Sequence, residues 1–179
     1  MGEALLIIDF QNDFTPGGAL AVEEGDQIAE RINELAASGR YELVIATRDW
    51  HPADHASFVS RGGPWPIHCV QDSPGAEFHA ALNQAAIHKI IDTGYRPDLD
   101  GYSAFEATDL VRILHDYGTT KVTVVGLATD YCVKNTVLDA LREGFEVEID
   151  TEAMRAVNVE PGDGERAIEE MLAAGATRL

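Results

Sequence analysis

The segment 47-TRDWHPADH-55 gathers two carboxylates and two imidazoles within nine residues. Asp49 and His51 alternate, so their side chains can point to the same side of an extended chain. Pro52 favours an extended conformation at His51, and His55 lies within reach of a turn. Such a stretch has two interpretations, a polar loop exposed to solvent or a metal site.

A further donor for a metal lies downstream, where 65-WPIHCV-70 contains His68. One carboxylate and three neutral imidazoles suit a divalent ion such as zinc, manganese or iron. A solvated loop would explain any one of the histidines, whereas four donors in one insertion favour the metal. We expect Cys69 to pack inward. The predicted ligands are Asp49, His51, His55 and His68.

A second kind of chemistry is indicated by Cys132 in the segment 126-GLATDYCV-133, which has the pattern of a strand, a tight loop and the start of a helix. At the start of a helix, the dipole would stabilise the thiolate and lower the pKa of the thiol. Backbone N–H groups of the loop could also hold an oxyanion. The alternative is a small buried side chain without a chemical role.

Two more residues could act with this cysteine. Asp9 follows the apolar run 4-ALLII-8, and its carboxylate could take a thiol proton and deliver it to a leaving amine. Lys89, flanked by isoleucines, could hold Asp9 ionised. The alternatives are a turn residue for Asp9 and an outward lysine on an edge strand for Lys89. We expect Asp9, Lys89 and Cys132 to meet beside the metal.

Strand-like and helix-like segments alternate along the chain. Strands are expected at 4–8, 43–47, 86–91, 121–128 and 145–149, with a short one in the final ATRL, and helices at 24–37, 106–117, 131–142 and 163–174. This alternation predicts an α/β fold with three layers, α/β/α, around a mostly parallel open sheet. Sites in such sheets form beyond the carboxyl ends of the strands. The insertion 48–85 breaks the rhythm, and long insertions are usually functional.

The size and charge of the chain limit its function. Its 179 residues suit one domain over 1–179. A net charge of −18 argues against nucleic acid and anionic membranes as partners and favours a small neutral or cationic substrate. No leader or membrane-spanning run is recognisable, so we expect a cytoplasmic protein with reduced cysteines. The protein is expected to be a monomer or a homo-oligomer.

Taken together, these segments resemble the nicotinamidases of the isochorismatase-like cysteine hydrolase superfamily. The matching motifs, in the order of the family, are 8-IDFQNDFTPGGALAV-22, 47-TRDWHP-52, 65-WPIHCV-70, Lys89, 102-YSAFE-106 and 126-GLATDYCV-133. They cover nearly the whole chain and imply the Rossmann-like hydrolase fold of the family. One departure is Ile90, because members of the family often carry glycine after the lysine.

The resemblance implies a role for each matching residue. The implied catalytic triad is Asp9, Lys89 and Cys132, and the implied metal ligands are Asp49, His51, His55 and His68. Backbone N–H groups of Ala128 and Cys132 would form the oxyanion hole, with a cis peptide bond before Ala128. Residues of the implied substrate pocket are Phe14 and Trp65, which would sandwich a pyridine ring, and Tyr102. The metal would hold the pyridine nitrogen and a water molecule.

The implied activity is the hydrolysis of nicotinamide to nicotinate and ammonia through a cysteine thioester, in NAD salvage, with pyrazinamide as a further substrate. One divalent ion is expected per chain, zinc first, with manganese or iron as alternatives. Three other functions stay open: a cysteine amidase for another small amide, a metal-hydroxide hydrolase in which Cys132 only packs, and a non-catalytic metal- or ligand-binding protein. Alkylation of the thiol separates the implied hydrolysis through Cys132 from the metal-hydroxide hydrolase, because a metal hydroxide needs no thiol.

Overall fold

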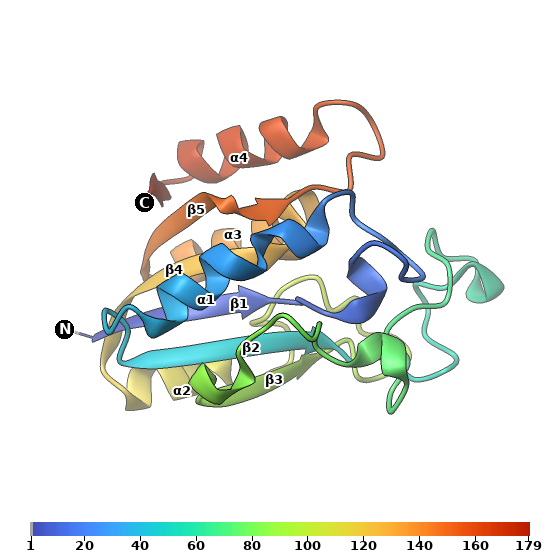
Figure 1. Ribbon diagram of the computed structural model, residues 1–179, viewed down its shortest axis with the longest axis horizontal. Helices are drawn as coiled ribbons and strands as arrows, with labels where there is room; N and C mark the ends of the chain where they lie inside the picture. Colours follow the sequence, from blue (N-terminus) through green and yellow to red (C-terminus); the bar gives the residue numbers. More distant parts are fainter. Residues whose placement is uncertain (1) are drawn as a thin grey trace.

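A computed structural model describes residues 2–179 and contains one six-stranded parallel sheet, whose strands run in the order β3-β2-β1-β4-β5-β6 (Figure 1). The strands are β1 (Gly2–Ile8), β2 (Leu43–Asp49), β3 (Lys89–Thr93), β4 (Thr119–Leu127), β5 (Glu146–Arg155) and β6 (Thr177–Arg178). The helices are α1 (Ala29–Ala37), α2 (Leu110–Asp116), α3 (Lys134–Arg142) and α4 (Asp163–Ala173). The expected α/β class and open parallel sheet are confirmed.

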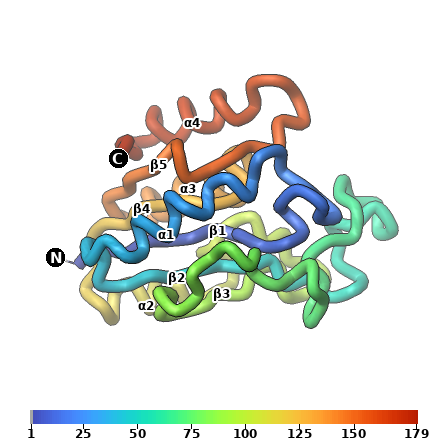
Figure 2. The backbone as a smooth tube through the Cα atoms, viewed as in Figure 1, coloured from blue at the N-terminus to red at the C-terminus, as the bar shows by residue number. Residues whose placement is uncertain are grey.

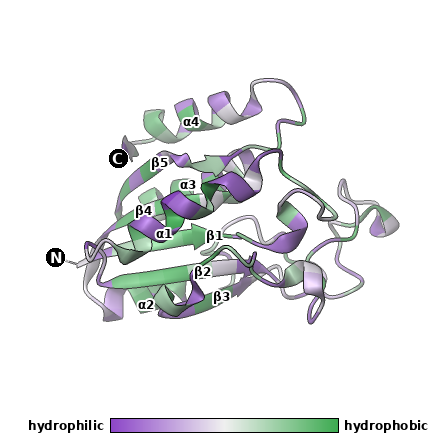
Figure 3. Ribbon diagram, viewed as in Figure 1, coloured by the Kyte–Doolittle hydropathy of each residue, from purple (hydrophilic) through white to green (hydrophobic). Residues whose placement is uncertain are grey.

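Helices cover both faces of the sheet because successive side chains of a buried strand point to opposite faces. Leu5 and Ile7 of β1 pack on the face that α1 covers with Ile32 and Leu35. Ala4, Leu6 and Ile8 of β1 pack on the face covered by α2, α3 and α4. The strands are the most hydrophobic part of the fold (Figure 3), and the result is the predicted arrangement of three layers.

The strand order reverses between β1 and β4, which are neighbours at the centre of the sheet. Connections from β1 lead outward to β2 and β3 in one direction, and those from β4 lead to β5 and β6 in the other. At such a point the loops beyond the strand ends diverge and leave a crevice in which ligands bind. Gly126 allows the two strands to approach closely, since its φ is +117° and a Cβ there would lie 2.1 Å from the carbonyl oxygen of Ile8.

The connection from β2 to β3 is the long insertion expected from the sequence. Its first part gathers beyond the carboxyl ends of the central strands, as the backbone trace shows (Figure 2). Its last part runs back beside α1, where Asn33 Nδ2 donates to the carbonyl of Ala81. The connection contains only short 3₁₀ turns, at Val59–Arg61, Pro74–Ala76 and Gln84–Ala86. Isolated bridges join His51 to Val70 and Phe58 to Trp65, and therefore bring distant parts of the insertion together.

Two elements differ from the prediction in ways that affect the site. The third strand was expected at 86–91, but β3 begins at Lys89 and ends at Thr93. The helix expected at 131–142 begins at Lys134 and is preceded by a π-helical turn, Thr129–Val133. No helix within residues 2–179 has both the length and the apolar character needed to span a membrane.

Candidate active site

Asp9 lies directly after β1, at the point where the strand order reverses. Its backbone adopts a left-handed conformation with φ of 47°, and its side chain is 1% exposed. Its Oδ1 accepts a hydrogen bond of 2.7 Å from Thr47 Oγ1, on the neighbouring strand β2. The backbone N–H of Asp9 also donates to the carbonyl of Thr47, at 3.2 Å. The carboxyl group is therefore held at a defined place at the edge of the sheet.

Cys132 reaches the same place from β4. The peptide bond between Leu127 and Ala128 is cis, as the resemblance implies, and the π-helical turn that follows carries the buried thiol. The sulfur of Cys132 lies beside the Asp9 carboxyl group, within 4.8 Å of one of its oxygens. Side-chain oxygens of Asp9 and Asp49 and the sulfur of Cys132 all lie within 4.8 Å of one another. The structure thus brings Asp9 and Cys132 together.

Burial and negative charge determine the protonation of this pair. Burial, followed by the charge of Asp49, raises the pKa of Asp9 from 3.8 to about 8, although hydrogen bonds from Thr47 and Cys132 act in the opposite direction. Burial and the charges of Asp9 and Asp49 raise the pKa of the Cys132 thiol. The expected lowering of this pKa by a helix dipole is wrong, because desolvation and two nearby carboxyl groups act more strongly than the helix start.

Lys89 does not join the pair, and its predicted position is corrected. It is the first residue of β3, pairs with Ile45, and is exposed. Its neighbours on a surface groove are Gln84, Ile87, His88 and Ile90. The residue of β3 that lies at the end of the strand, opposite Asp49, is Thr93. The predicted alternative, an outward lysine on an edge strand, describes Lys89 correctly.

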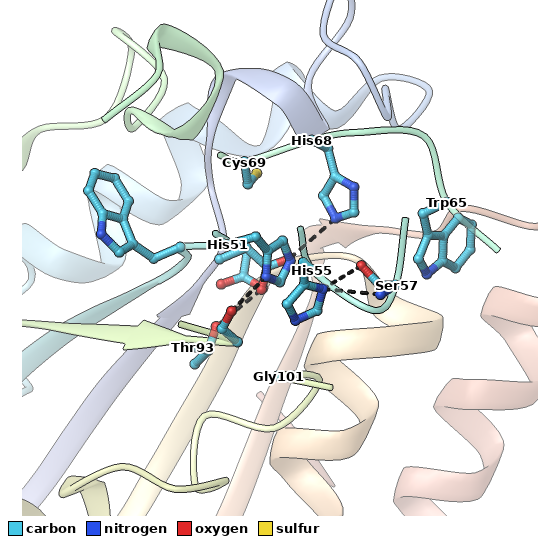
Figure 4. Close-up of polar contacts among 12 residues, drawn as sticks. His51, His55, Ser57, Trp65, His68, Cys69, Thr93 and Gly101 are labelled. Carbon is cyan, nitrogen blue, oxygen red and sulfur yellow. Dashed lines mark hydrogen bonds and ion pairs between the residues drawn. The ribbon is translucent and has the colours of Figure 1, made fainter. Parts of the chain in front are cut away.

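Three of the four predicted metal ligands form a buried cluster. Oxygen and nitrogen atoms of Asp49, His51 and His68 lie within 4.8 Å of one another. His51 Nε2 is 3.1 Å and His68 Nε2 is 3.7 Å from Asp49 Oδ2. Figure 4 shows the histidine rings converging at this point. The cluster follows from β2, which ends at Asp49, and from the bridge that brings His68 back to His51.

The chemistry of these donors fits a divalent cation. His51 Nδ1 is 2.8 Å from the carbonyl of Gly94, and His68 Nδ1 is 2.7 Å from the carbonyl of Pro66. Because a carbonyl only accepts, each Nδ1 donates a proton, and each Nε2 is directed towards Asp49. Burial lowers the pKa of His51, but the Asp49 carboxylate outweighs it and raises the pKa. The Nε2 atoms of both rings therefore face the Asp49 carboxylate, and a cation would fit between these three groups.

His55 is placed differently from the prediction. Its Nε2 is 2.6 Å from the carbonyl of Leu99 and its Nδ1 is 2.7 Å from Ser57 Oγ. The ring stacks on that of His51 with centroids 3.8 Å apart. Since both ring nitrogens already have other partners, the structure does not group His55 with the three donors. Its position instead limits the movement of the His51 ring.

Several supporting residues were not predicted. Gln11 is fully buried and binds the backbone of Asp49 twice, through Nε2 to its carbonyl and through Oε1 from its N–H, both at 2.8 Å. Gly94 has a φ of +55°, and a Cβ there would lie 2.5 Å from His51 Cε1. Gln11 lies within the motif 8-IDFQNDFTPGGALAV-22, so the resemblance could have identified it. Gly94 follows Thr93, and nothing in the sequence indicated that β3 ends there.

A cavity opens beside Cys132 and the metal donors. Phe14, Trp65 and Tyr102 line it, as the resemblance implies, and so does Ala128. Trp65 Nε1 donates to Tyr102 Oη at 2.9 Å, which fixes the two rings relative to each other. Lining residues that were not predicted are Leu20, Ser57, Asp100, Tyr131 and Val157.

Val157, one of these unpredicted residues, is held by the buried carboxylate of Asp130. Asp130 accepts hydrogen bonds of 2.9 Å from the backbone N–H groups of Val157 and Asn158. It therefore ties the loop after β5 to the turn that carries Cys132. The predicted helix cap by Thr129 or Asp130 is absent within the described residues, because no side chain caps this turn.

Comparison with known proteins places this site in a family. The family model of the isochorismatase domain matches residues 3–178. The nicotinamidase of Escherichia coli is 46% identical over 197 aligned residues, which cover 97% of this chain and 92% of that protein. The chain belongs to the isochorismatase family and is an amidohydrolase.

Two solved structures are similar to this chain over nearly its whole length. The zinc complex of the Pyrococcus horikoshii pyrazinamidase superposes with a TM-score of 0.92 at 48% identity, covering 100% of this chain and 99% of that one. PnC1 of L. infantum in complex with nicotinate gives a TM-score of 0.95 at 38% identity, covering 99% of this chain and 92% of that one. This chain is therefore similar, over nearly its whole length, to a pyrazinamidase and to a protein with bound nicotinate.

Proposed function

We propose that this protein is a nicotinamidase, which hydrolyses nicotinamide to nicotinate and ammonia in NAD salvage and also acts on pyrazinamide. One observation carries the proposal: a buried thiol, Cys132, lies within 4.8 Å of a buried carboxyl oxygen of Asp9, beside an aromatic cavity and three metal donors. The similarity to nicotinamidases over nearly the full chain supports the choice of substrate. Both cysteines are free thiols, which suits the reducing cytoplasm.

In the first half of the reaction, the Asp9 carboxylate takes the proton of the Cys132 thiol, and the sulfur attacks the amide carbon. The raised pKa of Asp9 makes it a stronger base, which reduces the mismatch with a thiol whose own pKa is raised. Backbone N–H groups of Ala128 and Cys132 would stabilise the oxyanion. When the C–N bond breaks, Asp9 returns the proton to the departing nitrogen, ammonia leaves, and a thioester remains.

The second half consumes one water molecule. Asp9, again a carboxylate, removes a proton from water as the oxygen attacks the thioester carbon. The C–S bond then breaks, the carboxylic acid leaves, and the thiolate recovers its proton from Asp9. The sum is amide and water converted to acid and ammonia. Thr47 keeps the Asp9 oxygen in place throughout, through its hydrogen bond of 2.7 Å.

Asp49, His51 and His68 would hold one divalent ion, for which we propose zinc. Two imidazoles and one carboxylate are a common zinc set that leaves a coordination position open. When bound, the ion would supply a Lewis-acidic position for the nitrogen of a pyridine or pyrazine ring. Phe14 and Trp65 would bind the faces of that ring, because flat apolar surfaces suit a planar heteroaromatic substrate.

The test is ammonia release from nicotinamide by the wild-type protein, by Cys132→Ala, and by wild type treated with iodoacetamide. We expect activity in the untreated wild type alone, with zinc content unchanged in Cys132→Ala. Activity of Cys132→Ala near that of wild type would refute the nucleophile and favour a metal-hydroxide hydrolase. Parallel assays on pyrazinamide and benzamide rank the substrates, and faster turnover of benzamide would refute a role for the ring nitrogen.

A further inference from the structure

The catalytic centre contains no lysine within the part of the chain that the structure describes. The main charged groups acting on Asp9 are Asp49 and His51, and those acting on Cys132 are Asp9 and Asp49. The cavity is likewise lined by neither lysine nor arginine among residues 2–179. Lys89 is exposed at the opposite end of β3. The residue at the active-site end of this strand is Thr93, and Gly94 follows it.

Thr93 contacts the metal donors rather than the reacting pair. Its side chain is buried, and its Oγ1 lies 3.1 Å from Asp49 Oδ1 and 3.2 Å from the carbonyl of Arg48. The hydroxyl has one proton, which these two acceptors share. Figure 4 shows the Thr93 side chain directed at the cluster. The next residue along the backbone contacts a second metal donor, because the carbonyl of Gly94 accepts a hydrogen bond of 2.8 Å from His51 Nδ1.

The two oxygens of Asp49 therefore have separate partners. Oδ2 faces the Nε2 atoms of His51 and His68, and Oδ1 faces Thr93. Without the hydroxyl, the carboxylate could rotate about its last bond and turn Oδ2 away from the histidines. Groups that orient a ligand in this way change metal affinity typically by 10–100-fold when they are removed.

We propose that Thr93 is a positioning residue that orients Asp49 for a divalent ion, and that the Asp9–Cys132 pair acts without a lysine. Catalysis without a lysine rests on the proposed function, whereas the role of Thr93 in orienting Asp49 does not. Thr93 and Gly94 at the end of β3 thus fix one oxygen of Asp49 and one nitrogen of His51. Hydrolysis then depends on Asp9 and Cys132 alone, and the positive charge near them comes from the metal cluster rather than from a lysine.

The experiment compares four proteins: wild type, Thr93→Val, Thr93→Ser and Lys89→Ala. Zinc affinity is measured by competition with a chromophoric chelator, and ammonia release from nicotinamide is measured at saturating zinc. Valine keeps the branched shape of threonine without the hydroxyl, and serine keeps the hydroxyl. Thermal unfolding checks the fold, and Thr93→Ala is the replacement if Thr93→Val does not fold.

We expect Thr93→Val to bind zinc roughly 10–100-fold more weakly and Thr93→Ser to bind it within a few-fold of wild type. Lys89→Ala should keep both the zinc affinity and the kcat of wild type. Unchanged zinc affinity in Thr93→Val would overturn the role of Thr93, and loss of kcat in Lys89→Ala would overturn catalysis without a lysine. A wild type that binds zinc but releases no ammonia would instead overturn the proposed function, while the zinc measurements would still decide the role of Thr93.

Discussion

The substitution Asp9→Asn should change how the stability of the metal-free protein depends on pH. The pKa of Asp9 is about 8 in the folded protein, against an ordinary value of 3.8, chiefly because of burial. The folded state therefore binds this proton more tightly than the unfolded state. The contribution of Asp9 to stability is fully present below about pH 4 and is lost as the pH rises through 8. Since one pKa unit corresponds to about 1.4 kcal/mol, the whole loss is roughly 6 kcal/mol.

The assay is urea unfolding of metal-free wild type and Asp9→Asn between pH 5 and pH 9. Asparagine has similar shape and no titrating proton, so the difference between the two proteins isolates Asp9. We expect the unfolding free energy of Asp9→Asn, relative to wild type, to rise by several kcal/mol across this range. Saturating zinc should reduce that rise, because a cation on Asp49 offsets the second cause of the raised pKa. Parallel pH curves for the two metal-free proteins would refute this account of the Asp9 carboxyl group.

Three further outcomes follow from the geometry of the site. Gly94→Ala should weaken zinc binding in a chelator competition, because the new Cβ would lie 2.5 Å from the His51 ring; wild-type affinity would show that the backbone moves freely there. Gln11→Leu should lower the unfolding free energy in urea by about 2–4 kcal/mol, because two buried backbone groups of Asp49 lose their partners; a loss below about 0.5 kcal/mol would contradict this. Maleamate, an amide with a carboxylate, should show a kcat/KM roughly 100-fold below that of nicotinamide, because Asp49 and Asp100 line the cavity and, among the described residues, neither lysine nor arginine does. Equal values of kcat/KM would contradict this expectation.

Much of the fold could be predicted from the sequence because buried parallel strands and amphipathic helices have clear patterns. The run ALLII before Asp9 and the run before Ala128 both form central strands, and the crevice between them lies at the predicted edge. The meeting of Asp9 with Cys132 and the convergence of Asp49 with two histidines follow from that topology. These are features of strand order and strand ends, which hydrophobic patterns indicate well.

The prediction for Lys89 failed because the end of a strand is harder to locate than the strand itself. The apolar residues around Lys89 predict a strand at 86–91, but β3 continues to Thr93. Four residues of a strand span roughly 13 Å, so this error moved Lys89 from one end of the sheet to the other. His55 shows a different limit, because spacing indicates that a side chain can reach a site but not how its ring is turned.

The most direct test of the central claim, nucleophilic attack by Cys132, is mass spectrometry of the protein quenched in acid during turnover of nicotinamide. The account predicts a nicotinoyl group on the peptide that contains Cys132 in the wild type. It predicts neither this adduct nor ammonia from Cys132→Ala. Continued ammonia release by Cys132→Ala, or turnover by the wild type with the acyl group on another residue, would contradict it.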